Sequence, residues 1–333
     1  MPTPKATVAI PVFNSEATLE RCLASASAQT LANIEIIVAD DGSTDGSAAL
    51  AEALAGRDPR IRVVRMERNG GKSRAMNHIL TIATGEWFAV LDADDTYHRE
   101  RLERLIREAE AHEVELAADN IAYIDDGVQQ VVQTGFDPGQ PSRLITKQDL
   151  AAHSNSFGSF DFGILKPVIQ RRFLLAHHLT YYEDTKLAED FYYLMNFFAA
   201  GGRGWLVAAP LYNWTMPFGA ISRRWTATGS GAWRYDYRQA LRANAHFIEQ
   251  MRQRGEPAFV AMLEARARQY RAMIPYLDAQ RLASERRWAQ ALLMIVRHPA
   301  TYRLLVTRIA GRIRRRRRGP AQPSLTVPGS AAP

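Results

Sequence analysis

The chain has 333 residues, of which 47% are hydrophobic and 23% are charged, so most of it is expected to fold around a large core. Its only cysteine, Cys22, excludes an internal disulfide and favours a reducing compartment. We find no secretory signal, and no apolar run reaches the roughly 18 residues that a membrane-spanning helix needs.

The net charge of +7 is distributed unevenly. Residues 281–333 contain 12 arginines and a single acid, Glu285, whereas residues 1–280 contain 30 basic and 34 acidic residues. A slightly acidic body therefore carries a strongly basic C-terminal arm. Because the body is acidic and no nucleic-acid-binding module is visible, we expect no nucleic acid as a partner.

Alternating strand and helix patterns fill the first 130 residues. Runs of apolar and β-branched residues predict strands, and apolar residues at helical spacing predict the helices between them. The strands are expected at 7–13, 33–40, 60–66, 86–92, 114–125 and 128–136, and the helices at 15–29, 45–56, 72–84 and 98–112. This alternation predicts a doubly wound, mostly parallel α/β sheet, which binds its ligands at the carboxyl ends of its strands.

The rest of the chain is less regular up to residue 228 and helical beyond it. A helix is expected at 187–200, with short strands near 204–215. We therefore expect a domain at 1–228 with halves at 1–130 and 131–228, a helical extension at 229–314 with a basic amphipathic end, and a disordered tail at 315–333.

Three carboxylates, those of Asp92, Asp94 and Asp95, follow the fourth predicted strand within four positions. Like charges this close repel each other unless something positive neutralises them. Mg²⁺ and Mn²⁺ prefer oxygen ligands, and Mg²⁺ is commonly bound by one or two carboxylates together with substrate phosphates. One interpretation is therefore a metal-bridged diphosphate. The other is a polar loop in which Asp95 or Thr96 caps the next helix.

A glycine pair with basic residues follows the third predicted strand, in "ERNGGKSRAMN". Gly70 and Gly71 permit a close approach of the backbone to a ligand. Lys72 and Arg74 place positive charge at the start of a helix, a position that suits a phosphate. For this segment alone, a surface turn is the alternative interpretation.

Four segments, in this order and at these spacings, resemble the nucleotide-sugar-binding half of glycosyltransferase family 2, the inverting enzymes of GT-A fold. They are "AIPVFNSEATLERCLASASAQT", "EIIVADDGSTDGS", "ERNGGKSRAMN" and "GEWFAVLDADD". The resemblance is dense over residues 5–100 and thinner to residue 225. It implies a Rossmann-like nucleotide-binding half at 1–130 and an acceptor-binding, catalytic half at 131–228.

The same resemblance implies roles for residues of the donor site. Asp40 would read the nucleotide base, and Pro11, Val12 and Asn14 would line the base and ribose. Lys72 occupies a position that meets the nucleotide or its phosphates in relatives.

Other donor-site roles follow from the phosphate side of the family pattern. Arg74 is expected to substitute for the arginine that many members carry where this chain has Met76. The D-x-D motif matches Asp92-Ala93-Asp94, which implies a divalent metal, Mn²⁺ or Mg²⁺, bound by Asp94 with Asp92, the latter nearer the ribose. The third metal ligand stays open, because residues 212–215 lack the histidine of the family's Tyr-Arg-x-His segment.

Sugar transfer also needs a base that takes the proton of the acceptor hydroxyl. Glu189 and Asp190 open an amphipathic helix, where acids also favour the helix dipole without any catalytic role. The resemblance implies that Asp190 is the base and that Glu189 assists it. A second pair, Glu183 and Asp184, ranks behind it because no helix-length apolar run follows directly.

The segment "FDFGILKP" resembles the acceptor-side segment of relatives that build bacterial exopolysaccharides, so Gly163 and Lys166 are expected near the acceptor or the diphosphate. Processive synthases carry Gln-x-x-Arg-Trp. In "ISRRW" at 221–225 the glutamine is replaced by Ile221, and this departure implies transfer of a single sugar.

The C-terminal arm combines an amphipathic pattern at 299–313 with a basic run that extends from Arg312 to Arg318. Such an arm is typical of a membrane-surface anchor, although a solvated tail without a role or a protein partner is the alternative. We expect a cytoplasmic enzyme, peripheral at the inner face of a bacterial membrane, that transfers sugar from a UDP-sugar to a lipid-linked saccharide acceptor. Guanosine and thymidine donors stay open, and the alternatives are a nucleotidyltransferase and a non-catalytic binding protein.

Overall fold

The computed structural model describes residues 3–127, 129–153, 160–216 and 237–299. Its first part repeats strand and helix as predicted. Strands β1 (Ala6–Val12), β2 (Ile34–Asp40), β3 (Ile61–Arg65) and β4 (Trp87–Val90) alternate with helices α1 (Glu16–Ser27), α2 (Ser47–Ala55) and α3 (Lys72–Ile82), and α4 (Arg101–Ala111) follows the short β5 (Thr96–Tyr97). The four predicted strands and the four predicted helices of this part are all confirmed.

The next part is more irregular. It contains β6 (Leu116–Asp125), β7 (Gln130–Thr134), β8 (Arg143–Ile145), α5 (Lys147–His153), the 3₁₀ helix η1 (Phe162–Ile164), β9 (Val168–Gln170), α6 (Arg171–Ala176), α7 (Glu189–Ala199) and β10 (Gly204–Met216). The predictions of β6, β7 and α7 are confirmed, and β10 is one continuous strand where short strands were expected. Strands β5, β8 and β9 were not predicted, because two or three residues are too few to show a period.

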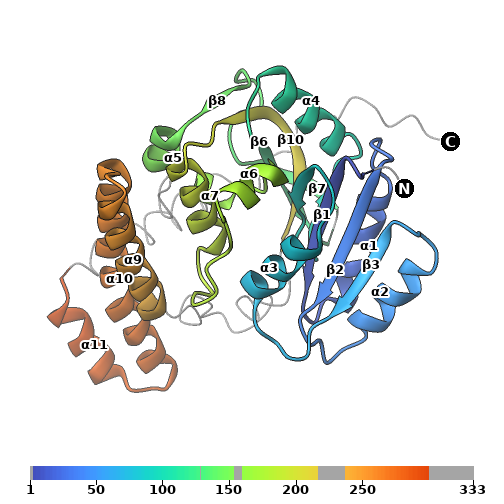
Figure 1. Cartoon of the computed structure of the whole chain (residues 1–333). Helices are drawn as coiled ribbons and strands as arrows, with labels where there is room; N and C mark the ends of the chain where they lie inside the picture. Colours follow the sequence, from blue (N-terminus) through green and yellow to red (C-terminus); the bar gives the residue numbers. More distant parts are fainter. Residues whose placement is uncertain (1–2, 128, 154–159, 217–236, 300–333) are drawn as a thin grey trace. The chain divides into compact units, whose positions relative to one another are not determined.

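The strands form one ten-stranded sheet with the order β3-β2-β1-β4-β9-β6-β10-β5, while β7 pairs with β6 and β8 pairs with β10 (Figure 1). Strands β3, β2, β1 and β4 are mutually parallel, and β6 is parallel to β10. The short β9 runs antiparallel between β4 and β6. The predicted α/β sheet is confirmed, with parallel strands at its nucleotide-binding end and a mixed second half.

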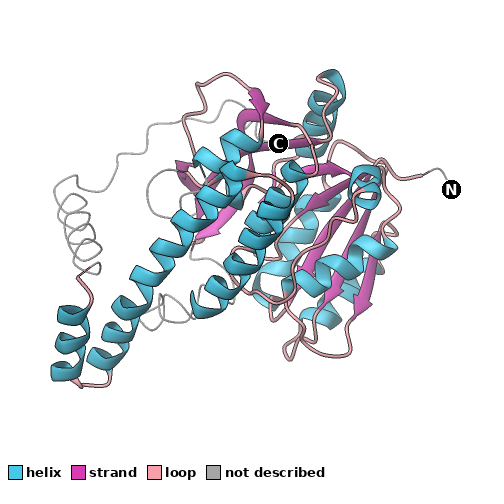
Figure 2. Cartoon of the chain, turned by 60° about the vertical axis from the view of Figure 1, so that its left-hand side comes forward, coloured by secondary structure: helices cyan, strands magenta, loops and turns pink. Residues whose placement is uncertain are grey.

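Alternate residues of the central strands point to opposite faces of the sheet, so the sheet separates two hydrophobic cores. Ala9 and Ile37 belong to a core that includes residues of α3 and α7. Val8 and Ile36 belong to a second core that includes residues of α1 and α4. Figure 2 shows the corresponding layers of helices around the strands. This arrangement leaves the strand ends, rather than the sheet faces, available for a ligand.

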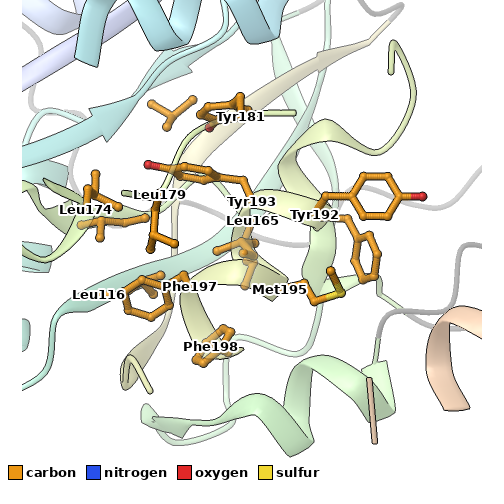
Figure 3. Close-up of a cluster of buried hydrophobic side chains, with 14 of the residues drawn as sticks. Leu116, Leu165, Leu174, Leu179, Tyr181, Tyr192, Tyr193, Met195, Phe197 and Phe198 are labelled. Atoms are coloured by element: carbon orange, nitrogen blue, oxygen red, sulfur yellow. The ribbon is translucent and has the colours of Figure 1, made fainter. Parts of the chain in front are cut away.

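Helix α7 is buried along most of its length, which fixes the position of its first residues. Figure 3 shows its side chains among leucines from other segments. The labelled residues are Leu116, Leu165, Leu174, Leu179, Tyr181, Tyr192, Tyr193, Met195, Phe197 and Phe198. All of these are at most 5% exposed. Glu189 and Asp190 therefore begin a helix that is anchored by its apolar side chains.

The C-terminal part is helical, as predicted, with α9 (Tyr237–Gln253), α10 (Pro257–Ser284) and α11 (Trp288–Arg297). The chain divides into two compact units, Met1–Tyr270 and Arg271–Pro333, so the division falls inside α10. Residue 228, the segment 221–225 and the arm beyond residue 299 lie outside the described residues. Among the described helices, none combines the length and the hydropathy that crossing a bilayer requires.

Gly85 allows the turn between α3 and β4 to pass close to β1. A Cβ atom on Gly85 would lie 2.4 Å from Thr7 N and 2.6 Å from Ala6 C, both backbone atoms. We predict that Gly85→Ala lowers the free energy of unfolding by about 2–4 kcal/mol, because the backbone must shift to admit the methyl group. Urea unfolding measures the change.

The matched control is Gly56→Ala at the end of α2. A Cβ atom there would lie 3.5 Å from Ala53 O, which is an ordinary contact. Its free energy of unfolding should change by less than about 0.5 kcal/mol. Equal destabilisation by the two substitutions would contradict the packing argument.

Candidate active site

Asp40 ends β2 at the edge where the parallel strands β1, β2 and β4 finish. It is paired in register with Val12 of β1 and is 4% exposed. Its Oδ1 atom is buried and has no hydrogen-bond partner within the described part of the chain. A buried carboxylate oxygen without a partner is costly. Asp40 therefore offers an acceptor that a ligand with an N–H group could satisfy.

The other residues expected around the base are placed differently by the structure. Val12 is 1% exposed and its side chain lies in the core with α1. Asn14 has a left-handed φ of 50°, and its Oδ1 accepts a hydrogen bond from Thr44 N at 2.8 Å. Pro11 is partly buried within β1. Val12 and Asn14 thus support the strand end and the loop after β2, and contact of these residues with a base or ribose stays a prediction.

Asp41, which received no role from the sequence, holds the glycine pair against the end of β2. Its carboxylate accepts hydrogen bonds from Gly70 N at 2.8 Å and from Gly71 N at 2.7 Å. Gly71 has a φ of 90°, which favours glycine, and directly precedes α3. The loop is thus tied to the sheet and fixes Lys72 as the first residue of α3, while its contact with a phosphate stays a prediction.

Arg74 lies in the first turn of α3, and its Cδ fills the space beside Gly70. It makes no hydrogen bond or ion pair with other described residues. Its charge is therefore available to an anionic ligand, and its contact with the phosphates stays a prediction.

Two lysines bridge the acids that follow β4 and those that open α7. Lys72 Nζ lies 2.9 Å from Asp92 Oδ1, 2.9 Å from Asp190 Oδ2 and 3.5 Å from Glu189 Oε1. Lys166 Nζ lies 2.7 Å from Asp92 Oδ2 and also contacts Asp190 Oδ2. We call these five residues the lysine–carboxylate cluster. It joins four segments of the chain that are far apart in sequence.

The charges of the cluster stabilise one another against burial. Burial lowers the pKa of Lys72, but Asp190, Asp92 and Glu189 outweigh it and raise that pKa well above its usual value. Burial likewise lowers the pKa of Lys166, and Asp190 and Asp92 raise it by more. Burial raises the pKa of Asp92, but Lys166 and Lys72 hold it well below its usual range. Both lysines and Asp92 are therefore charged at neutral pH.

The two oxygens of Asp190 are in different situations. Both lysines contact Oδ2, whereas Oδ1 is buried and has no hydrogen-bond partner in the described segments. Ala188, which precedes the pair on α7, has a left-handed φ of 63°. This conformation is strained for a residue with a Cβ atom. It lies directly before the turn from which Asp190 contacts the lysines.

The second acidic pair, Glu183 and Asp184, does not join this cluster. Both residues are exposed, and Glu183 Oε1 accepts a hydrogen bond from Asn77 Nδ2 at 2.8 Å. The structure therefore favours Asp190 over Asp184 as the carboxylate beside the lysines.

Asp95 is held in place by hydrogen bonds and is not part of the lysine–carboxylate cluster. It is 1% exposed and accepts hydrogen bonds from Tyr212 Oη at 2.7 Å and Thr215 N at 2.9 Å. Burial, followed by the charges of Asp94 and Asp92, raises its pKa well above the usual value. It does not cap α4, since Glu100 precedes that helix and Thr96 begins β5, so the capping alternative is wrong.

The remaining residues of the D-x-D motif differ in exposure. Asp94 is partly exposed, whereas Ala93 is 6% exposed and packs in a core. The described residues contain no group of three or more His, Cys, Asp or Glu side chains that could hold a metal by itself. A divalent ion at Asp94 would thus need oxygen ligands from a substrate as well, which is the usual situation for Mg²⁺.

A buried ion pair supports the segment that carries Lys166. Arg101 and Asp119 are 0% and 1% exposed, and Arg101 Nη2 donates to Asp119 Oδ1 at 2.7 Å and to the backbone carbonyl of Lys166. Asp119 Oδ2 accepts a hydrogen bond from Leu211 N at 3.1 Å. This pair was not predicted from the sequence. The one available signal was Asp119, a charged residue inside the apolar strand pattern of 114–125.

Tyr212 connects β10 to the acidic loop, because its Oη donates to Asp95 and accepts from Asp92 N at 3.2 Å. We predict that Tyr212→Phe lowers the free energy of unfolding by about 1–3 kcal/mol, since it leaves buried polar atoms without a partner. Urea unfolding at neutral pH measures this change.

Tyr193→Phe is the control for that experiment. Tyr193 Oη is also buried but has no hydrogen-bond partner among the described residues. Its removal should therefore cost less than about 0.5 kcal/mol. The assigned role of Tyr212 fails if both substitutions have the same effect.

Comparisons with known proteins identify the family of this chain. The sequence pattern of Glycosyl transferase family 2 matches residues 7–168. The succinoglycan biosynthesis protein ExoO of Rhizobium meliloti (strain 1021) is 30% identical over 314 residues, which are 94% of this chain and 87% of the relative. ExoU of the same organism, also a succinoglycan biosynthesis protein, is 36% identical over 200 residues, covering 59% of this chain and 57% of the relative.

A solved structure supports the fold. S. aureus TarS, residues 1–349, in complex with UDP-GlcNAc superposes with a TM-score of 0.55 at 21% identity, over 66% of this chain and 60% of that one. The resemblance seen in the sequence is thus confirmed, and the sheet is that of a GT-A fold. The family pattern matches the first half of this chain, and ExoO matches it along most of both chains. This chain therefore belongs to glycosyltransferase family 2.

Proposed function

We propose that this protein is an inverting hexosyltransferase that moves one sugar from a nucleoside-diphosphate sugar to a saccharide acceptor. The observation that carries the proposal is the lysine–carboxylate cluster. It sets two ammonium groups, which suit a diphosphate, beside a buried carboxylate oxygen, which suits the proton of a hydroxyl. Membership of a glycosyltransferase family favours sugar transfer over the nucleotidyltransferase alternative.

Asp190 is the general base in this proposal. The acceptor hydroxyl oxygen attacks the anomeric carbon, the bond from that carbon to the diphosphate oxygen breaks, and the hydroxyl proton moves to Asp190. The receiving atom is Oδ1, because it is buried and unpartnered in the described structure while Oδ2 contacts the lysines. Attack from the side opposite the diphosphate inverts the anomeric configuration. Glu189 assists by orienting the Lys72 ammonium, 3.5 Å away.

Donor binding would change the partners of the two lysines. In the free protein, both ammonium groups contact Oδ2 of Asp190. A diphosphate carries more negative charge than a carboxylate and competes for Lys72 and Lys166. Lysines drawn toward the diphosphate stabilise the leaving group and release the Asp190 carboxylate to take the acceptor proton.

A divalent cation, Mn²⁺ or Mg²⁺, fits the charges of this site. The three carboxylates of the cluster exceed its two ammonium groups by one negative charge, and Asp94 adds another. A diphosphate therefore needs additional positive charge, to which Arg74 also contributes. Asp94 and Asp92 would hold the ion together with the diphosphate. The bound ion supplies Lewis-acid stabilisation of the leaving group.

Asp40 supports the choice of a UDP-sugar as donor. Its buried, unpartnered Oδ1 suits the ring N–H of a pyrimidine base such as uracil. The neighbour TarS was solved with UDP-GlcNAc. Pro11, Asn14 and the backbone of Val12 and Ala93 would complete the donor site.

The relatives suggest the biological setting. Two of them are named for succinoglycan biosynthesis, which supports a lipid-linked saccharide acceptor in bacterial exopolysaccharide or cell-surface polysaccharide assembly. The basic arm from Arg312 to Arg318, outside the described residues, would hold the enzyme at the anionic cytoplasmic face of the membrane.

We predict that Asp190→Asn lowers kcat by about 10²-fold or more while nucleoside diphosphate binding is retained, because the base is lost but the lysines stay. Transfer assays and calorimetry measure the two quantities. Asp184→Asn is the matched control and should behave like the unaltered protein. Full turnover by Asp190→Asn would remove this carboxylate from the mechanism.

Lys166→Met is expected to lower kcat by about 10²-fold, because an ammonium that stabilises the leaving diphosphate is removed. Transfer assays at saturating donor measure kcat. The exposed Lys186 gives the control, Lys186→Met, which should leave kcat unchanged. An undiminished kcat for Lys166→Met would contradict a role of its ammonium group in stabilising the leaving diphosphate.

For the metal, Asp94→Ala should abolish the increase in UDP affinity that Mn²⁺ produces, since the cation loses its protein ligand. Isothermal titration with and without Mn²⁺ measures the increase. Asp137→Ala, at an exposed acid, should leave it unchanged. If Mn²⁺ still increases the UDP affinity of Asp94→Ala, Asp94 is not the metal ligand.

A further inference from the structure

Helix α11 presents an apolar face that the described structure leaves uncovered. Trp288 is 67% exposed, Leu292 63%, Leu293 48% and Val296 56%. These are four of the eight large hydrophobic side chains that are exposed among the described residues. Trp288, Leu292 and Val296 recur every fourth residue, so they lie on one side of the helix. Such a concentration in a single helix marks an interaction surface.

The opposite side of α11 already makes the contacts that fold it. Ala291 is 5% exposed and belongs to a small core with Ala279 and Leu282 of α10, against which Met294 and Ile295 also pack. The exposed residues of α11 take no part in this core. The packing of α11 on α10 therefore gives no reason for them to be large and apolar.

The charges around the exposed face are almost all positive. Arg286 and Arg287 directly precede α11, and Arg297 is its last residue. Arg287 pairs with Glu285 at 3.1 Å, whereas Arg286 and Arg297 form no ion pair within the described segments. Glu285 is the one acid after residue 281 in the whole sequence. The surface is thus apolar in its middle and cationic at both ends, which complements an anionic bilayer.

The helix is suited to lie on a membrane rather than to cross it. Its 10 residues are too few for a span. Tryptophan is favoured at the boundary between headgroups and acyl chains, and Trp288 is the most exposed residue of the face.

We propose that the outer face of α11, formed by Trp288, Leu292, Leu293 and Val296, inserts into the headgroup region of an anionic lipid bilayer. The inference extends the proposed membrane location to a defined surface distinct from the arm at 312–318. It does not depend on the transfer reaction. A second copy of the chain is the competing occupant of this face.

Leu293→Glu tests the proposal in the full chain. With vesicles of phosphatidylcholine and phosphatidylglycerol, flotation should show a roughly tenfold or greater loss of binding, because a leucine that would enter the bilayer is replaced by a charge that anionic lipid repels. Leu175→Glu in α6 is the matched control, since Leu175 is 47% exposed and Leu293 48%. It should bind like the unaltered chain. Circular dichroism checks that both variants are folded.

A second readout reports insertion itself. Acyl-chain-brominated lipid should quench part of the tryptophan fluorescence of the bound protein, and Trp288→Phe should remove that part while binding continues. Part of the binding should also persist at high salt, because apolar contact is not screened.

Three results would overturn the proposal. The first is that the unaltered chain does not bind vesicles, and the second is that Leu293→Glu binds them as well as the unaltered chain does. The third is that the unaltered chain is a dimer that Leu293→Glu dissociates without changing vesicle binding. Each would leave the test of Asp190 unaffected, because these assays need no donor.

Discussion

The pairing of the Lys72 and Lys166 ammonium groups with the carboxylates of Asp92 and Asp190 is the interaction on which the site depends. Buried charges are tolerated only when opposite charges lie in contact, so these groups hold the end of β4, the start of α3, the segment before β9 and the start of α7 at one point. We propose that the same pairing prepares the site for chemistry, because a diphosphate could replace the carboxylates as the partner of both lysines.

The rest of the fold fixes the position of these four groups. Asp41 ties the glycine loop to β2 and so sets Lys72 at the start of α3. The Arg101–Asp119 pair holds the backbone of Lys166. The buried aromatic side chains of α7 anchor Asp190 (Figure 3). Each support is a contact between segments distant in sequence, which explains how flexible lysine side chains are kept in one arrangement.

The sequence was sufficient to predict the parallel strands, the helices between them and the acidic strand ends, because these features are local and periodic. It also predicted that Lys72, Asp92 and Asp190 belong to a site. It could not predict that lysines would be the partners of Asp92, since that depends on the three-residue β9 placing Lys166 beside β4. Arg101 gave no local signal at all, because its burial follows from long-range packing.

We propose that the lysines exchange Asp190 for the donor diphosphate, and a crystal structure of the protein with a nucleoside diphosphate and Mn²⁺ tests this exchange most directly. The Lys166 and Lys72 ammonium groups should contact diphosphate oxygens there, and Asp190 Oδ2 should have lost both contacts. A bound nucleotide with Asp92 and Asp190 still joined to the two lysines would contradict the exchange.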